Sequence, residues 1–346
     1  MVKKHIFNGI IMKFLVTGAT GFAGPHMINK ILEEGHEVVA MTRNLSSVQS
    51  IVDILGEENM EKVNFVYGDL TELDSITNIF IKHKFDGVFH LGAFAHPPSS
   101  FRTPLLASQT NLLGSAQICD SIAMLQPECV LMHCSTPEVY GICPGDRKIK
   151  EDTPMRPNNP YGVSKAASDM YVLERAASIG LKTFLTRAFS HTGPRRGFNF
   201  SISSDAIQIA RILRGEQEPV IKIGNMKSRR IVADVRDIVD VYYRLMVAYF
   251  DGRVENGEVF HIAGNDLNEM QHYLDIMLEL SGLKDKVDLE IEPKFLRKVE
   301  IPVQIPDDSK TRKLLNWEPK IPIETTLQDL VDYWLNRLEQ ENKNGN

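Results

Sequence analysis

The sequence predicts an α/β protein with a doubly wound parallel sheet, followed by a smaller α/β C-terminal domain. Short apolar segments alternate with segments of helical periodicity as far as about residue 190, which is typical of βαβ units. A glycine-rich loop separates the first strand from the first helix. Beyond residue 190, glycine and proline pairs interrupt shorter elements, which indicates a less regular second domain.

Each expected strand is a short apolar run bounded by turn residues. The strands are expected at residues 14–17, 37–42, 63–67, 86–93 and 130–136. The first helix is expected at residues 25–34, where Gly35 can end it, and an amphipathic helix is expected at residues 325–341. Parallel strands need crossovers, so this order predicts right-handed βαβ units with helices on both faces of the sheet.

The glycine-rich loop runs from Gly18 to Gly24 and includes Thr20, Gly21 and Phe22. Glycines in this position allow a tight turn, a close approach of the backbone to a pyrophosphate and close packing of helix on strand. The N-terminus of the following helix presents free N–H groups to the phosphates. We therefore expect a Rossmann-type domain that binds a dinucleotide.

The ends of the second and third strands indicate which dinucleotide is bound. The second strand is followed by Arg43 and no carboxylate, and an arginine there can pair with a ribose 2′-phosphate. NADP is therefore expected, with NAD less favoured, although a solvated surface arginine is the alternative for Arg43. Asp69 can accept a hydrogen bond from the adenine amino group, or it can be a simple turn residue.

The change from regular strand–helix alternation to less regular elements near residue 190 sets the expected domain boundaries. Residues 12–190 are expected to form the NADP-binding domain, with residues 231–264 packing back onto it. Residues 191–230 and 265–335 are expected to form the second, ligand-binding domain, and residues 336–346 a tail.

The composition limits the partners and the location. The chain has 346 residues and a formal charge of −6, which argues against a nucleic-acid partner. The four cysteines lack C-x-x-C spacing, and no cluster of residues suggests a metal. We see no signal peptide in the first residues and no apolar run long enough to span a membrane. A cytoplasmic protein is expected.

Candidate catalytic residues lie after the fifth strand and on the helix that follows. Tyr161 and Lys165 are four residues apart and share one face of a helix. A lysine ammonium beside a phenol lowers the pKa of the tyrosine, which can then act as a base. Thr136 and Glu138 follow the fifth strand, and in an extended segment their side chains point to the same side.

Together these motifs resemble the extended short-chain dehydrogenase/reductase superfamily, over residues 13 to about 335. Within it, the chain is similar to the GDP-mannose 4,6-dehydratases and the related GDP-4-keto-6-deoxymannose reductases. The motifs that carry the resemblance are at residues 18–24, 68–70, 90–93, 135–141, 161–165, 190–197, 223–226 and 315–319.

The resemblance implies that Thr136, Tyr161 and Lys165 form the catalytic triad. In the dehydratase reaction, Tyr161 would take the C4 hydroxyl proton while NADP⁺ accepts the C4 hydride. Glu138 would then remove the C5 proton, water would leave from C6, and the hydride would return to C6. A structural carboxylate is the alternative for Glu138.

The resemblance also implies the remaining contacts. The cofactor-binding residues beyond those above would be Leu70, Leu91, Ala93, Asn111, Tyr161, Lys165 and His191. The residues around a GDP-sugar substrate would be Ser190, Arg196, Asn199, Arg230, Arg297 and Glu300. A homodimer or homotetramer is expected, because two helices of the nucleotide domain commonly form the dimer face in this superfamily.

Several departures keep two other functions open. Ser190 replaces the familiar Asn, Pro137 cannot serve as the acid found in glucose-type dehydratases, and Ile231 replaces an expected Asp. The segment 161–165 is closer to the reductases, whereas residues 195–197 are closer to the dehydratases. An NADPH-dependent reductase or epimerase of a GDP-4-keto-6-deoxyhexose is thus the alternative, and a non-catalytic NADP sensor is a second one.

Overall fold

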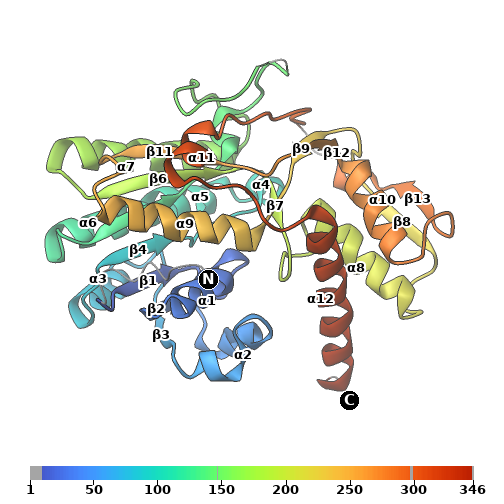
Figure 1. Cartoon of the computed structure of the whole chain (residues 1–346), viewed down its shortest axis with the longest axis horizontal. Helices are drawn as coiled ribbons and strands as arrows, with labels where there is room; N and C mark the ends of the chain where they lie inside the picture. The colour runs from blue at the N-terminus through green and yellow to red at the C-terminus, as the bar shows by residue number, and fades with distance from the viewer. Residues whose placement is uncertain (1–9, 146, 297–298, 345–346) are drawn as a thin grey trace.

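The computed structural model describes residues 10–145, 147–296 and 299–344. In this part of the chain the central element is a seven-stranded sheet in which every pair of strands is parallel (Figure 1). In chain order its strands are β1 (Lys13–Thr17), β2 (Glu37–Thr42), β3 (Asn64–Tyr67), β4 (Gly87–His90), β5 (Val130–Cys134), β6 (Thr183–Ala188) and β11 (Glu258–Ile262).

Across the sheet the strands follow the order β11-β6-β5-β4-β1-β2-β3. The direction of winding therefore reverses between β1 and β4, the place where open α/β sheets bind ligands at the carboxyl ends of their strands. The predicted fold class is confirmed. Two strands end earlier than expected, β4 at His90 and β5 at Cys134, because the chain leaves the sheet there.

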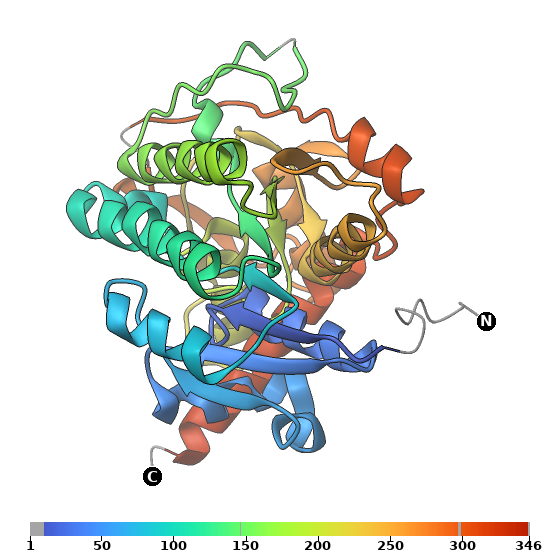
Figure 2. The same cartoon turned by 90° about the vertical axis from the view of Figure 1, so that its left-hand side faces the viewer.

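Helices cover both faces of this sheet. On one face lie α1 (Ala23–Glu33), α2 (Val52–Met60) and α9 (Val235–Phe250), and on the other lie α3 (Leu73–Lys82), α6 (Gly114–Leu125) and α7 (Pro160–Ile179). Strand alternation explains the two layers. Phe14 and Val16 of β1 pack with the first set of helices, whereas Leu15 packs with the second. Figure 2 views α6 and α7 from outside.

A second hydrophobic cluster lies beside the sheet, where α8 (Ser201–Leu213), α10 (Met270–Leu280) and α12 (Ile323–Asn344) pack together. The final helix was expected at residues 325–341, and its existence is confirmed. Three two-stranded sheets accompany this cluster: β7 (His191–Thr192) with β10 (Ala233–Asp234), β9 (Arg229–Ile231) with β12 (Leu267–Glu269), and β8 (Val220–Ile223) with β13 (Asp288–Ile291). The domain boundaries stay a prediction.

Short helical segments connect these elements. They are η1 (Leu45–Ile51), α4 (Pro97–Ser100), α5 (Pro104–Ser108), the π-helical η2 (Gln109–Leu113), η3 (Pro137–Tyr140), η4 (Pro293–Phe295) and α11 (Ser309–Leu315). In the described ranges, every helix is too short or too polar to cross a membrane. All four cysteines are free thiols.

Candidate active site

The glycine-rich loop forms a cradle of closely packed backbone before α1. Gly18 has a φ of +70°, and a Cβ atom on it would lie 2.8 Å from the Gly92 Cα. A Cβ on Gly24 would lie 2.3 Å from the Gly18 carbonyl oxygen. No side chain caps the beginning of α1, so no side chain satisfies the N–H groups of its first turn. The cradle fits the pyrophosphate of a dinucleotide.

The residues after β2 and β3 differ in how freely they can reach a ligand. Arg43 is exposed, and no interaction ties its side chain to another described residue. By contrast, the Asp69 Oδ1 accepts from both the backbone N–H and the hydroxyl of Thr71, each at 2.8 Å. One oxygen of Asp69 therefore stabilises a turn, and only the other is left to accept from a ligand.

Leu70, Leu91 and Ala93, three of the predicted cofactor residues, lie beside the glycine-rich loop. Asn111, a fourth, fixes the segment that follows β4. Leu70 is buried against Gly92 and Gly114, next to Leu91 and Ala93. The Asn111 Oδ1 accepts from the Phe94 N–H at 2.7 Å. Its Nδ2 donates to the Phe94 carbonyl at 3.1 Å and to the Ser164 hydroxyl at 2.9 Å. Asn111 thus ties the segment after β4 to α7.

The N-terminus of α7 carries the predicted Tyr–Lys pair. Its cap is Asn159, whose Oδ1 accepts from the Gly162 N–H at 2.8 Å. The Asn159 Nδ2 donates to the Glu138 Oε2 at 2.7 Å, so one amide both caps the helix and orients a candidate catalytic carboxylate. Asn159 is not among the site residues predicted from the sequence. An Asn followed by Pro at the first helical position was the signal that could have found it.

A helix-capping hydrogen bond joins Thr136 to Glu138. We expected an extended segment, but the chain forms the 3₁₀ helix η3 with Thr136 as its N-cap. The expectation of an extended segment is wrong, because Pro137 favours the first position of a helix. The Thr136 Oγ1 accepts from the Glu138 N–H at 3.3 Å, and the Tyr161 phenol is hydrogen-bonded to the Thr136 side chain. The three candidate catalytic residues therefore lie together.

The electrostatics of the Tyr–Lys pair differ from the expectation. Burial raises the pKa of Tyr161, and the hydrogen bond with Thr136 opposes this only in part. Burial lowers the pKa of Lys165, and its Nζ donates to the Cys134 carbonyl at 2.6 Å. Because Lys165 is directed to a backbone oxygen, it does not offset the burial of the phenol in this geometry. The Tyr161 phenol is protonated at neutral pH.

A positive charge lies between aromatic rings beside Tyr161. The Arg196 guanidinium is 4.6 Å from the ring centre of Phe22 and 3.5 Å from that of Phe200. Burial lowers the pKa of Arg196 to about 10, which leaves it charged at neutral pH. Among the described residues no carboxylate pairs with it. An unpaired, half-buried cation of this kind favours an anionic ligand.

His191 and Asn199 flank this arginine. The His191 ring stacks on Phe22 with ring centres 5.7 Å apart, and burial lowers the pKa of His191 to about 4. Asn199 is exposed, and its carbonyl is hydrogen-bonded to the His96 Nε2 at 3.1 Å. Ser190 accepts from the Ala233 N–H through its carbonyl, at 3.0 Å.

The other predicted substrate residues form a pair on β9 and the segment that follows η4. The Arg230 Nη2 donates to the Ile301 carbonyl at 2.8 Å and lies 3.9 Å from the Glu300 Oε1. Arg230 is largely buried, so this pairing offsets part of the cost of desolvating its charge. Arg297 lies outside the described residues.

A buried network connects the elements that carry the catalytic residues. Asp169 is one turn beyond Lys165 on α7, and its Oδ2 accepts from the Arg187 Nε at 2.9 Å. The Arg187 Nη1 donates to the Tyr140 hydroxyl at 2.6 Å, which joins β6 to η3. His133 lies 3.4 Å from the other oxygen of Asp169. No group of metal-ligating side chains occurs in the described part of the chain.

A doubly wound sheet with a glycine-rich loop, a strand-end Thr and a Tyr–Lys pair defines the class of extended short-chain dehydrogenases/reductases. The profile described as GDP-mannose 4,6 dehydratase matches residues 15–330. The chain belongs to this family, and the predicted resemblance is confirmed. It is a sugar-nucleotide enzyme of the extended short-chain type, a dehydratase or a reductase.

Two curated relatives and one solved structure illustrate the likeness. GDP-mannose 4,6-dehydratase of Vibrio cholerae is 26% identical, and the alignment covers 92% of each chain. GDP-6-deoxy-D-mannose reductase of Pseudomonas aeruginosa is also 26% identical, over 95% of this chain and 99% of the relative. The structure of RMD from Pseudomonas aeruginosa, complexed with NADPH, has a TM-score of 0.79 at 24% identity and covers 94% and 99% of the two chains.

Proposed function

We propose that this enzyme is an NADP-dependent dehydratase that converts GDP-mannose to GDP-4-keto-6-deoxymannose. The observation that carries the proposal is the placement of Glu138 beside Thr136 and Tyr161, with its carboxylate oriented by Asn159. Elimination of water across C5 and C6 needs a carboxylate in addition to the tyrosine. A dehydratase relative at 26% identity supports the same conclusion.

In the proposed reaction Tyr161 and Glu138 transfer protons, and Thr136 orients the substrate. Tyr161 takes the proton of the C4 hydroxyl once its own phenol has lost its proton, and Thr136 orients that hydroxyl through its own hydroxyl. The resulting ketone acidifies the C5–H, and Glu138 removes that proton. The C6 hydroxyl leaves as water after protonation by Glu138 or Tyr161, since Pro137 carries no acid. A nicotinamide held beside Tyr161 and Lys165 would supply the acceptor for the C4 hydride and its donor to C6, and the proton that remains on Tyr161 or Glu138 would go to C5, so that no net oxidation would result.

Arg196 supports the assignment of a diphosphate substrate. Its charge is held between two rings and lies close enough to Tyr161 for the two groups to interact electrostatically. A planar guanidinium binds two phosphate oxygens at once. A diphosphate here would place the attached sugar near the tyrosine.

The direct test is to incubate the protein with GDP-mannose and a catalytic amount of NADP⁺. A 4-keto-6-deoxy sugar nucleotide, identified by mass spectrometry and NMR, is the expected product. If none forms while NADPH is consumed on addition of the keto-sugar nucleotide, the enzyme is a reductase.

The reductase or epimerase is the second candidate, and one observation favours it. Burial raises the pKa of Tyr161, so the phenol is protonated and suited to donate a proton to a C4 ketone. A reductase relative matches at the same 26% identity.

Glu138→Gln separates these two candidates. A glutamine keeps an oxygen that can accept from Asn159, but it cannot remove the C5 proton. We expect dehydration to slow by about a hundredfold or more, with the dissociation constant for NADP unchanged by calorimetry. Glu218→Gln, at an exposed position, is the matched control. Full dehydratase turnover in Glu138→Gln would remove this residue from the mechanism.

Arg43→Ala tests the choice of cofactor. The side chain is exposed just after β2 and makes no contact that its removal would break among the described residues. We expect NADP to bind about tenfold more weakly, the loss of a charge-assisted contact, while the affinity for NAD stays the same. Arg211→Ala, exposed on α8, serves as control. Equal affinities for NADP before and after the change would leave Arg43 as a surface residue.

We propose that the homodimer or homotetramer forms through the outer faces of α5, η2, α6 and α7. These faces expose Leu105, Leu113, Met124, Val163 and Met170, each by more than half of its accessible surface. These elements are neighbours, and apolar side chains exposed together on neighbouring helices favour a protein contact. A monomeric mass in light scattering at micromolar concentration would contradict the proposal. The cytoplasmic location stays a prediction from the sequence.

A further inference from the structure

Arg195, which the sequence analysis left without a role, is bound to the glycine-rich loop. Its Nε donates to the Gly21 carbonyl and its Nη2 to the Thr20 carbonyl, both at 3.1 Å. The Nη2 also donates to the Ser50 hydroxyl at 3.0 Å, and the Nη1 donates to the Ser50 carbonyl. One guanidinium therefore joins the loop before α1 to η1, the segment that follows Arg43.

The backbone at Arg195 is in the left-handed region. Its φ is +74°, a conformation that disfavours side chains with a Cβ. The Arg196 N–H donates to the Gly193 carbonyl at 3.1 Å, which closes a turn with Pro194 in its second position. Proline second and a positive φ third are features of a type II turn, where glycine is the usual third residue. An arginine stands where glycine would be less strained.

This turn directs two consecutive arginines to different places. Arg196 extends between Phe22 and Phe200 in the candidate substrate site, whereas Arg195 extends to the carbonyls of the glycine-rich loop. The turn therefore connects the two ligand sites through adjacent residues.

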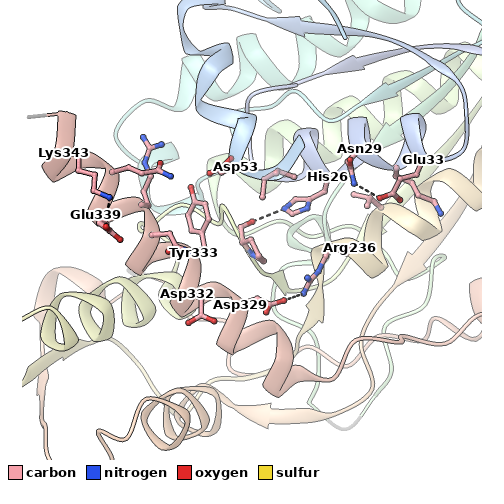
Figure 3. Close-up of a pocket in the computed structure, with 17 residues that line it drawn as sticks. His26, Asn29, Glu33, Asp53, Arg236, Asp329, Asp332, Tyr333, Glu339 and Lys343 are labelled. Atoms are coloured by element: carbon pink, nitrogen blue, oxygen red, sulfur yellow. Dashed lines mark hydrogen bonds and ion pairs between the residues drawn. The ribbon is translucent and has the colours of Figure 1, made fainter. Parts of the chain in front are cut away.

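Side chains on α1, α2 and α12 also hold this turn in place. The His26 Nε2 is 3.0 Å from the Pro194 carbonyl, and burial lowers the pKa of His26 to about 4, so the neutral ring donates this bond. The Asp53 carboxylate lies 3.6 Å from the Arg195 Nη1 and accepts from the Tyr333 hydroxyl. His26, Asp53, Pro194 and Tyr333 line a pocket of about 790 Å³ between the three helices and α9 (Figure 3).

We propose that Arg195 is a positioning residue for the cofactor loop, an inference that rests on the proposed dinucleotide binding. A trans peptide directs its C=O and N–H groups in opposite directions. By holding the Gly21 carbonyl, Arg195 sets the direction of the Phe22 N–H at the beginning of α1. That N–H belongs to the donors that a pyrophosphate uses at a helix N-terminus.

The test compares Arg195→Ala, Arg195→Gly and Arg195→Lys with the wild type. Glycine removes the guanidinium but relieves the backbone, so a role limited to the turn would leave NADP binding intact in Arg195→Gly. We expect both truncations to weaken NADP binding by about tenfold or more, and lysine, with a single cationic group, to recover part of the loss. Arg214→Ala, whose side chain pairs with Glu216, is the control.

Hydrogen–deuterium exchange of the cofactor-free protein provides a readout that does not depend on ligand. In Arg195→Ala and Arg195→Gly, amides of residues 18–24 and 45–53 should exchange faster, with the remaining sheet unchanged. Wild-type NADP affinity in both truncations, or unchanged exchange in the two segments, would overturn the proposal. If the wild type binds no nicotinamide dinucleotide, the proposed function fails, and the exchange data alone decide on Arg195.

Discussion

Tyr161→Phe should lower kcat by about a thousandfold or more, within the range by which a positioned acid or base contributes to catalysis. Removing the hydroxyl deletes the group that exchanges a proton with the C4 oxygen and the hydrogen bond with Thr136. The ring itself is buried at the N-terminus of α7 and remains in place, so folding should change little. Because dehydratase and reductase both need this proton transfer, the result is expected for either reaction.

The measurement is the initial rate with the sugar nucleotide that the wild type converts, together with the dissociation constant for NADP. Tyr67→Phe removes an exposed hydroxyl that contacts only Glu72 among the described residues and should leave the rate unchanged. A rate within tenfold of wild type for Tyr161→Phe would contradict the assignment. Cofactor binding without turnover of any sugar nucleotide by the wild type would support the alternative of a sensor.

Asp169→Ala should reduce the free energy of unfolding by about 3–5 kcal/mol, because it leaves a buried arginine without its carboxylate. Arg187 is almost fully buried, and its Nε donates to Asp169. The loss should also displace η3, since the same guanidinium donates to the Tyr140 hydroxyl. Urea unfolding monitored by fluorescence measures the stability, and Asp251→Ala, at an exposed position, is the control.

The same variant should show a characteristic pH dependence. Burial alone would raise the pKa of Asp169, but the adjacent His133 ring and the charge of Arg187 outweigh it and lower that pKa below the ordinary value of 3.8. A carboxyl with a lowered pKa in the folded state stabilises the protein fully above its unfolded pKa. The difference between wild type and Asp169→Ala should therefore be constant near neutrality and shrink as the pH falls below about 3.8. A difference that does not change with pH would mean that the carboxylate charge contributes nothing.

Local patterns predicted much of the fold and part of the site. Five of the seven strands of the central sheet, the glycine-rich loop and the final helix follow from hydrophobic periodicity and turn residues, which act over a few positions. The pairing of Tyr161 with Lys165 on one helix follows from the period of 3.6 residues, and both are on α7. The strand ends were less accurate, because the chain leaves the sheet at His90 and Cys134 to form the loops of the site.

The sequence alone determined the doubly wound sheet, the order of its first five strands and the residue types at the ends of those strands. The tertiary structure decided how those residues face one another. It placed Thr136 and Glu138 in a helical cap, directed Lys165 to the Cys134 carbonyl, and brought Arg195 to Gly21, a residue 174 positions earlier in the chain. Such contacts depend on how the helices pack on the sheet. Because the two partners are far apart in the sequence, no local sequence pattern predicts that they meet.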